Sequence, residues 1–294
     1  MKVLSDQEGT RYAMWIGDTA RWALDEEVKT TPKPGLVDLA SNGAHSDMDA
    51  SLFFRSARTL MPYFAEAAWM GLCMETEPEG LFVQLRQWGK RAERAMYMAT
   101  EGVNTHKGAI FTMGIFCAIA GRCICEGKKN IPYIQQLERQ MVMKQLQQEI
   151  EALSQRNAVT HGENNFCRYG SRGVRGMAID GYREVFEKAL PVLREGIERD
   201  ENWNTVKLQV LITLMSCVED SNIISRSDPS LLRAVQLEMK DFLLHGGAYQ
   251  KDAIRKLERM DEKFVLDNIS GGGSADLLAL TIFLDRILIG NAGK

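Results

Sequence analysis

The sequence lacks the features that mark several common classes of protein. Its six cysteines include no C-x-x-C pair. Cys123 and Cys125 would point to different faces of a helix, which excludes a cysteine zinc site. Residues 1–15 contain no apolar signal-peptide core. The most apolar run, residues 109–121, is too short to span a bilayer and is typical of a buried core helix.

The net charge and the cysteines indicate which partners and which cell compartment to expect. The net charge is −3, so no overall basic surface indicates a nucleic-acid or membrane partner. Hydrophobic residues make up 45% of the chain, which is enough for a sizeable core. The cysteines lie mostly in apolar helical patterns, so we expect buried, reduced thiols. We therefore expect a cytoplasmic protein.

Helical periodicity dominates what the chain does contain. No segment alternates polar and apolar residues between hairpin turns, so we predict an all-α fold, with residues 1–294 forming a single compact multi-helix domain. Asp228, Pro229 and Gly246 have the residue types of an N-cap, a first helical position and a left-handed C-terminal position. Helices are predicted over residues 12–29, 50–74, 80–100, from 107, 132–156, 177–199, 203–218, 229–245, 250–266 and from 275. We expect residues 160–176 to be irregular.

Polar and glycine-rich residues gather in five segments at the ends of these helices, where binding groups tend to lie. In "TPKPGLVD", prolines on both sides of Lys33 can hold the lysine against a phosphate, or simply make a rigid connector. In the following "NGAHSDMD", Asp47 and Asp49 fit either a helix N-terminal turn or a hydrated Mg²⁺.

The other segments carry similar alternatives. His106 and Lys107 precede a buried helix and suit an anion site, although Asn104 or Thr105 there can be simple caps and His106 a core residue. The run from Gly271 through Gly272 and Gly273 to Ser274 is either a backbone cradle for phosphate or a flexible turn. Arginines set among glycines, Arg172 and Arg175, suit bidentate phosphate contacts. Asp220 and Asn222 lie at the end of an apolar helix, where polar groups are costly, and Arg226 follows them. Individually, each of these residues can belong to a surface ion pair. Their repetition favours a polyphosphate–Mg²⁺ site.

These segments resemble one enzyme family. "TPKPGLVD", "NGAHSDMD", "GVNTHKGAIF", "THGE…YGSRGVRG" and "GGSADLLALTIFL" occur in the order found in triphosphoribosyl-dephospho-CoA synthase, from about residue 20 to 286. The resemblance implies that ATP and 3′-dephospho-CoA react to give the triphosphoribosyl product and free adenine. It also implies that this product is a prosthetic-group precursor, passed on to the acyl-carrier-protein maturation machinery of citrate lyase or malonate decarboxylase. A homodimer is compatible with so much apolar helix surface.

Glycosyl transfer of this kind passes through an oxocarbenium-like transition state, which carboxylates can stabilise. On the resemblance, Asp47, Asp49, Asp220 and His45 are the candidate catalytic residues, with Asp38 a weaker candidate. Mg²⁺ is expected at Asp47, Asp49, Asp220 and Asp276. Phosphate contacts are assigned to Lys33, His106, Lys107, Arg172, Arg175, Arg226 and the backbone of Gly271, Gly272, Gly273 and Ser274.

One departure from the family pattern is chemically significant. Related sequences commonly read "RGEA" where this chain has "RGMA", so Met177 replaces an acid that Glu163 or Asp180 would have to supply. Two alternatives follow: a catalytically weakened relative that binds a CoA-like nucleotide, and a hydrolase that cleaves the N-glycosidic bond with water as acceptor.

Overall fold

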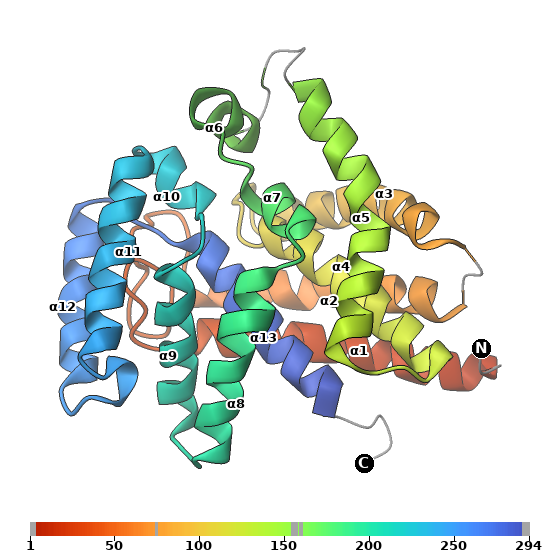
Figure 1. Cartoon of the computed structure of the whole chain (residues 1–294), viewed down its shortest axis with the longest axis horizontal. Coiled ribbons are helices and arrows are strands. Elements are labelled where there is room, and N and C mark those ends of the chain that lie inside the picture. Colours follow the sequence, from red (N-terminus) through yellow and green to blue (C-terminus); the bar gives the residue numbers. More distant parts are fainter. Residues whose placement is uncertain (1–3, 74–75, 154–157, 159–160, 290–294) are drawn as a thin grey trace.

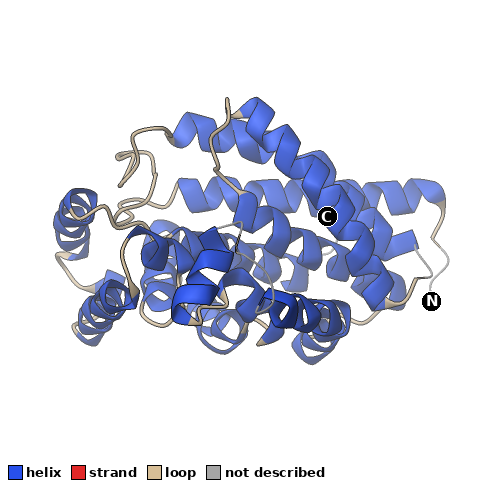
Figure 2. Ribbon diagram, turned by 90° about the horizontal axis from the view of Figure 1, so that it is seen from above, coloured by secondary structure: helices blue, strands red, loops and turns tan. Residues whose placement is uncertain are grey.

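The computed structural model describes residues 4–73, 76–153, 158 and 161–289. Within these residues the chain folds into helices and loops without a strand (Figure 2). The helices are α1 (Asp6–Val28), α2 (Ala50–Cys73), α3 (Pro78–Ala99), α4 (Lys107–Glu126), α5 (Ile131–Leu153), α6 (His161–Tyr169), α7 (Gly173–Ile179), α8 (Leu190–Glu198), α9 (Trp203–Met215), α10 (Ser221–Arg226), α11 (Pro229–Leu244), α12 (Ala253–Leu266) and α13 (Gly272–Ile289). The all-α prediction is confirmed.

Helix ends with clear chemical signals were predicted well. Asp228 accepts hydrogen bonds from the backbone N–H groups of Ser230 and Leu231 at the start of α11. Gly246, just after that helix, has a φ of 105°, in the left-handed region that favours glycine. Helix α4 is long and apolar enough to cross a membrane, but 78% of its most apolar window is buried inside the fold. It is the core helix that the sequence predicts.

Three expectations about the elements were wrong. Residues 160–176 are not wholly irregular, because α6 and α7 form there; Asn165 of α6 donates hydrogen bonds to Ser221 O and Ser225 Oγ of α10 and so anchors the segment. The helix predicted over 177–199 is broken near Gly181, whose φ of 72° lies in the left-handed region. The last helix begins within the glycine run, at Gly272. Residue 74 and residues 154–156, predicted at helix ends, lie outside the described residues.

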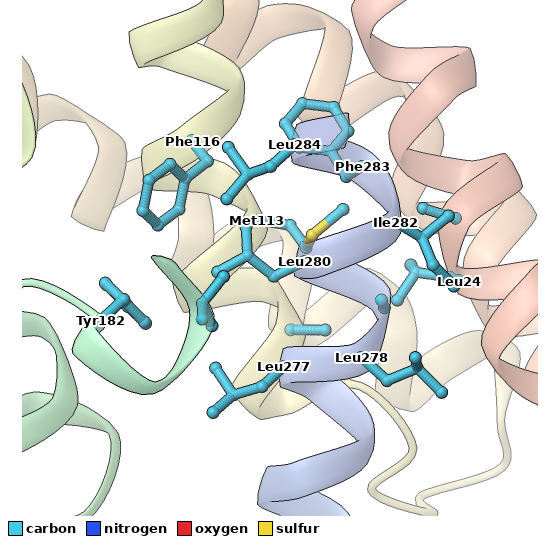
Figure 3. Packing of buried hydrophobic residues seen from close by; sticks show 14 of the residues in the cluster. Leu24, Met113, Phe116, Tyr182, Leu277, Leu278, Leu280, Ile282, Phe283 and Leu284 are labelled. Carbon is cyan, nitrogen blue, oxygen red and sulfur yellow. The ribbon is translucent and has the colours of Figure 1, made fainter. Parts of the chain in front are cut away.

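The centre of the fold is a group of four helices, α1, α2, α4 and α13, which pack against one another. Figure 3 shows α13 between α1 and α4, with Leu277, Leu280 and Leu284 among the side chains that fill the space. Helix α2 approaches α4 so closely that a Cβ on Gly71 would lie 1.9 Å from the carbonyl oxygen of Ala118. Glycine is therefore required at this crossing.

Further helices cover this centre on two sides. Helices α3 and α5 pack on one side of α4, and α8 and α9 pack on α13 (Figure 1). Helices α11 and α12 lie beyond α9 at the edge of the molecule (Figure 1). Trp88 on α3 is 36% exposed, and Cys73 and Cys167 are exposed, whereas the sequence predicted buried thiols. All six thiols are free.

A long loop, residues 29–49, crosses the end of this helical assembly and is held at several points. The backbone N–H of Gly35 donates to Asp261 Oδ1 at 2.8 Å, and that of Thr31 donates to Asn204 Oδ1 at 3.0 Å. A Cβ on Gly35 would lie 2.1 Å from the carbonyl oxygen of Ile269, so only glycine fits there. The loop is therefore a fixed wall against which a ligand can bind.

Candidate functional site

A cavity of about 850 Å³ opens between this loop and the helices. Its walls come from the loop, from α3, from α7, and from the first turns of α4 and α13. The N-termini of α4 and α13, two helices of 20 and 18 residues, therefore both face it. Helix N-termini favour negative charge. The volume is large enough for a nucleotide-sized ligand.

The charged side chains lining the cavity are strongly unbalanced. Among the described residues seven are cationic and three are acidic, although the whole chain carries a net charge of −3. A cleft lined by one sign of charge concentrates ligands of the opposite sign. The cations are Lys33, Arg86, Lys90, Lys107, Arg172, Arg175 and Arg226, and the acids are Glu27, Glu93 and Asp276. The cavity is therefore suited to polyanionic ligands.

Lys33 lies at the floor of the cavity and forms an ion pair with Glu27 at the end of α1. Both side chains are buried, with 1% and 6% of their surface exposed. The backbone N–H of Lys33 donates to Asp38 Oδ2 at 2.8 Å, and the other oxygen of Asp38 accepts from Ala40 and Ser41. Asp38 thus organises the loop around the lysine. Glu27 was missed by the sequence analysis, since nothing in its helix distinguishes it from other charged residues.

His106 lines the same floor just before α4. Its Nδ1 lies 2.7 Å from Ser56 Oγ, while Nε2 is buried without a hydrogen-bond partner among the described residues. Burial, with a further contribution from Lys33, lowers the pKa of His106 to about 3. The ring is therefore neutral at physiological pH, so it can meet a phosphate or a base only through a hydrogen bond and not as a cation.

Asp276, in the first turn of α13, lines the cavity opposite the start of α4. A Cβ on Gly108 would lie 2.0 Å from its Oδ2, so the carboxyl group occupies the space that this glycine leaves open. Burial raises its pKa well above the usual value, and the charges of Glu27 and Asp220 add to the effect. No described residue donates a hydrogen bond to it. Such a carboxyl group can hold a proton at neutral pH.

Asp220 is buried but does not line the cavity. Its Oδ2 accepts from the backbone N–H and the hydroxyl of Ser274, at 2.8 and 3.0 Å, and its Oδ1 accepts from Asn222 N. Burial raises its pKa, and these hydrogen bonds oppose that rise. Asp220 therefore joins α10 to α13, and its carboxylate already uses the N–H of Ser274. Gly271 and Ser274 lie outside the lining, whereas Gly272 and Gly273 belong to it.

Asp47 and Asp49 are exposed residues of the loop and lie outside the cavity lining. Asp49 Oδ1 accepts from the backbone N–H of Leu52 at 2.8 Å, which is the helix-capping role that the sequence allowed. Asp47 lies 3.9 Å from His45 Nδ1. Their neighbours His45 and Met48 do line the cavity, so the two carboxylates are close to its rim.

His45 and Arg226 are brought together although they are far apart in sequence. Nε2 of His45 lies 2.9 Å from Ser270 Oγ, and an Arg226 nitrogen lies 3.2 Å from its Nδ1. Arg226 also donates to Ala44 O at 2.9 Å and to the side chain of Asn268 at 2.6 Å. Burial, followed by the charge of Arg226, lowers the pKa of His45. Arg226 thus fastens the loop to α10 at the cavity wall.

The remaining predicted cations line the cavity in ion pairs. Lys107 contacts Glu93 at 2.6 Å, Arg172 pairs with Asp180, and Arg175 contacts Glu149 at 3.3 Å.

Two cations on α3, Arg86 and Lys90, also line the cavity and were missed by the sequence analysis. Their i, i+4 spacing could have indicated a shared face, but α3 resembles an ordinary amphipathic helix. Met177 of α7 lines the cavity, whereas Glu163 and Asp180 do not.

The carboxylates do not assemble a metal site by themselves. Among the described residues, no group of three or more His, Cys, Asp or Glu side chains could hold a metal ion. Asp220 is engaged at two helix starts, and the exposed Asp47 and Asp49 lie outside the cavity lining to which Asp276 belongs. A Mg²⁺ ion bound here would therefore take most of its ligands from phosphate oxygens and water.

The structure is all-α and contains a cavity whose charged lining residues are mainly cations. The chain belongs to the CitG family, described as ATP:dephospho-CoA triphosphoribosyl transferase, whose model matches residues 13–292. It is 36% identical to a probable 2-(5''-triphosphoribosyl)-3'-dephosphocoenzyme-A synthase of Salmonella gallinarum, over 92% of this chain and 89% of the relative.

Two further relatives are similarly close. The 2-(5''-triphosphoribosyl)-3'-dephosphocoenzyme-A synthase of Klebsiella pneumoniae is 37% identical, over 91% of this chain and 89% of its own length. A probable synthase of Acinetobacter calcoaceticus is 36% identical, with coverage of 95% and 92%. No solved structure matches the chain. The resemblance noted in the sequence is thereby confirmed.

Proposed function

We propose that this protein transfers the 5-triphosphoribosyl group of ATP to the 2′-hydroxyl of 3′-dephospho-CoA and releases adenine. The observation that carries the proposal is the cationic cavity, which has room for nucleotides and collects residues from all five segments shared with the family. In the reaction, the bond between ribose C1′ and adenine N9 breaks and a bond from C1′ to the acceptor oxygen forms. The acceptor hydroxyl loses a proton and adenine gains one.

The triphosphate is assigned to the polar end of the cavity, where the loop meets the first turns of α4 and α13. Lys33 and Lys107 supply charge, His106 a hydrogen bond, and Gly272 and Gly273 a wall without side chains. Arg172 and Arg226 line the same cavity, and Arg175 lines it beside Glu149 of α5. A cation such as Lys107 can leave its partner Glu93 and bind a phosphate instead, because the phosphate carries more negative charge than the carboxylate.

Two carboxyl groups at the floor have environments suited to different tasks. Glu27 is ion-paired to Lys33 and therefore carries its charge near the reacting sugar, where it can stabilise an oxocarbenium ion. Asp276 is the best placed residue to deliver a proton to the departing adenine, since its carboxyl group faces the cavity and accepts no hydrogen bond from the described residues. His45 is a further proton-transfer candidate.

The magnesium ion belongs to the same proposal. When bound with ATP it neutralises charge on the triphosphate. Asp47 and Asp49, exposed at the rim, are the carboxylates that would hold it from the protein side. Asp220 supports the site by fixing α10 against α13.

The biological setting also follows the family resemblance. The proposed product would feed acyl-carrier-protein maturation for citrate lyase or malonate decarboxylase. A cytoplasmic enzyme is supported by its six free thiols and its use of ATP. We further propose that residues 1–294 act as one domain, which the single continuous core supports.

One observation favours a second candidate, a binding protein with weakened catalysis. Met177 lines the cavity where related sequences commonly carry an acid. The two candidates differ in an assay of purified protein with ATP and Mg²⁺, in which free adenine is measured with and without dephospho-CoA. The transferase releases adenine only when the acceptor is present. Nucleotide binding without adenine release would favour the binding protein, and release without acceptor would indicate a hydrolase.

A further inference from the structure

The cavity has a second end, formed by helices rather than by the five loop segments. Phe82 and Leu85 of α3, Phe111 of α4, and Ile150 and Leu153 of α5 line it. The rings of Phe82 and Phe111 meet edge to face with centroids 6.1 Å apart. Helices α3, α5 and α7 lie together on one side of α4 (Figure 1). This end is apolar, unlike the floor around Lys33.

Cations border this apolar end. Arg86 and Arg175, from α3 and α7, both pair with Glu149 of α5, and all three side chains are 27–28% exposed. The Arg86 guanidinium lies 5.8 Å from the ring centre of Phe82, which places it directly beside the apolar wall. Lys90 follows one turn later on α3 and has no hydrogen bond or ion pair to any described residue. Glu149 therefore positions the guanidinium groups of Arg86 and Arg175, and Lys90, unpaired among the described residues, lies one turn away from Arg86 on α3.

We propose that this end of the cavity binds the acceptor substrate, with Arg86 and Lys90 on its diphosphate and the apolar wall along its pantetheine arm. This proposal rests on the proposed function. It adds that ATP binds at the Lys33 end of the cavity and dephospho-CoA at the apolar end. ATP has a triphosphate but no long extension beyond its adenosine. Dephospho-CoA has both a diphosphate and a long arm rich in CH₂ and CH₃ groups. Only the acceptor can therefore use cations and an extended apolar wall together.

The assignment also satisfies the geometry of the reaction. The acceptor hydroxyl is on the ribose, which is joined to the diphosphate of dephospho-CoA. With the diphosphate at Arg86 and Lys90, this ribose can extend toward the Lys33 end of the same cavity. The triphosphoribosyl group of an ATP held at Lys33 and Lys107 is then on the opposite side of the acceptor hydroxyl. Both substrates fit one cavity without competing for the same cations.

The test compares three single variants of the full-length protein: Arg86→Ala, Lys90→Ala and the control Arg91→Ala. Arg91 lies on the same helix, where it stacks on Trp88 at 4.8 Å, and it does not line the cavity. Losing one charged hydrogen bond weakens binding roughly 10- to 100-fold. We expect the KM for dephospho-CoA to rise about 10-fold or more in each of the first two variants. The KM for ATP should change less than about 2-fold, and Arg91→Ala should match the wild type.

A binding measurement keeps the inference separate from the proposed function. Calorimetry of dephospho-CoA and of ADP, which lacks the arm, needs no turnover. Ile150→Asn and Arg86→Ala should each weaken the binding of dephospho-CoA, and neither should change the binding of ADP, which can occupy the donor end as ATP does. A rise in the KM for ATP alone, unchanged dephospho-CoA binding in Arg86→Ala, or an equal effect of Arg91→Ala would overturn the assignment. Loss of adenine release in the wild type would refute the proposed function instead, and the calorimetry would still decide this assignment.

Discussion

The buried carboxyl group of Glu138 should make the stability of the protein fall as the pH rises. This α5 residue is fully buried, and neither carboxyl oxygen has a hydrogen-bond partner among the described residues. Burial raises its pKa from 4.5 to about 8, although Arg139 opposes the change. Below pH 4.5 the group is protonated in both the folded and the unfolded state. Between pH 4.5 and 8 the unfolded chain ionises while the folded protein keeps the proton, so stability falls as the pH rises.

The size of this effect follows from the pKa of Glu138 in the folded and in the unfolded protein. A tenfold difference in proton affinity is worth about 1.4 kcal/mol, so the wild type loses on the order of 4 kcal/mol of stability through Glu138 by pH 8. The variant Glu138→Gln replaces the protonated acid with a neutral group of similar shape and cannot ionise. We therefore expect equal stability near pH 4.5 and an advantage for the variant that grows with pH. For a chain of this size the Tm difference at pH 8 is roughly 8 °C.

The assay is thermal and urea unfolding of both proteins at half-unit steps from pH 4.5 to 9. The control is Glu262→Gln, which removes an exposed carboxylate on α12 and should show no growing difference. A constant difference between wild type and Glu138→Gln across the pH range would refute the reasoning, because it would mean that Glu138 ionises alike in both states. A variant that becomes less stable at high pH would refute it as well.

Three other predictions concern the core and the cavity floor. Gly71→Ala should lower the free energy of unfolding by about 3 kcal/mol, because the alanine Cβ would lie 1.9 Å from a backbone oxygen of α4. Urea denaturation measures this change. An unchanged free energy of unfolding would show that α2 and α4 can move apart freely. Lys33→Met should lower the free energy of unfolding by about 3–5 kcal/mol, because it leaves Glu27 buried and unpaired. Adding Glu27→Gln to the same chain should restore part of this stability. A single variant as stable as the wild type would contradict the ion pair. Asp276→Asn should keep its Tm and its affinity for ATP in calorimetry but lose at least about 100-fold in adenine release; near-normal turnover would remove Asp276 as the proton donor.

The sequence was most informative where one residue type has one structural use. The start and end of α11 follow from Asp228, Pro229 and Gly246, because a side-chain cap, a fixed φ and a left-handed turn are each local requirements. Helices α6 and α7 were missed because they depend on distant contacts. The hydrogen bonds from Asn165 to α10 form only after the chain has folded, and no local pattern signals them.

In the candidate site, too, local patterns predicted some residues, whereas others depend on contacts between distant segments. Lys33, His106 and Arg226, which come from three of the loop segments, line one cavity, and their assignment to phosphate stays a prediction. Their partners were not predictable, because Glu27 and Ser56 belong to helices with no distinguishing motif.

No local sequence pattern indicates that α3 contributes residues to the cavity. Arg86 and Lys90 have the spacing of ordinary solvated helix residues, and only the packing of α5 and α7 beside α3 makes them part of a site.

The most direct test of the central claim follows a label from ATP. The purified protein is incubated with Mg²⁺, dephospho-CoA and ATP that carries ¹³C in the ribose, and the products are analysed by mass spectrometry. We predict that the labelled ribose and all three phosphates become attached to dephospho-CoA, with one adenine released for each product formed. Labelled ribose triphosphate free in solution, or adenine release without any labelled dephospho-CoA product, would contradict it.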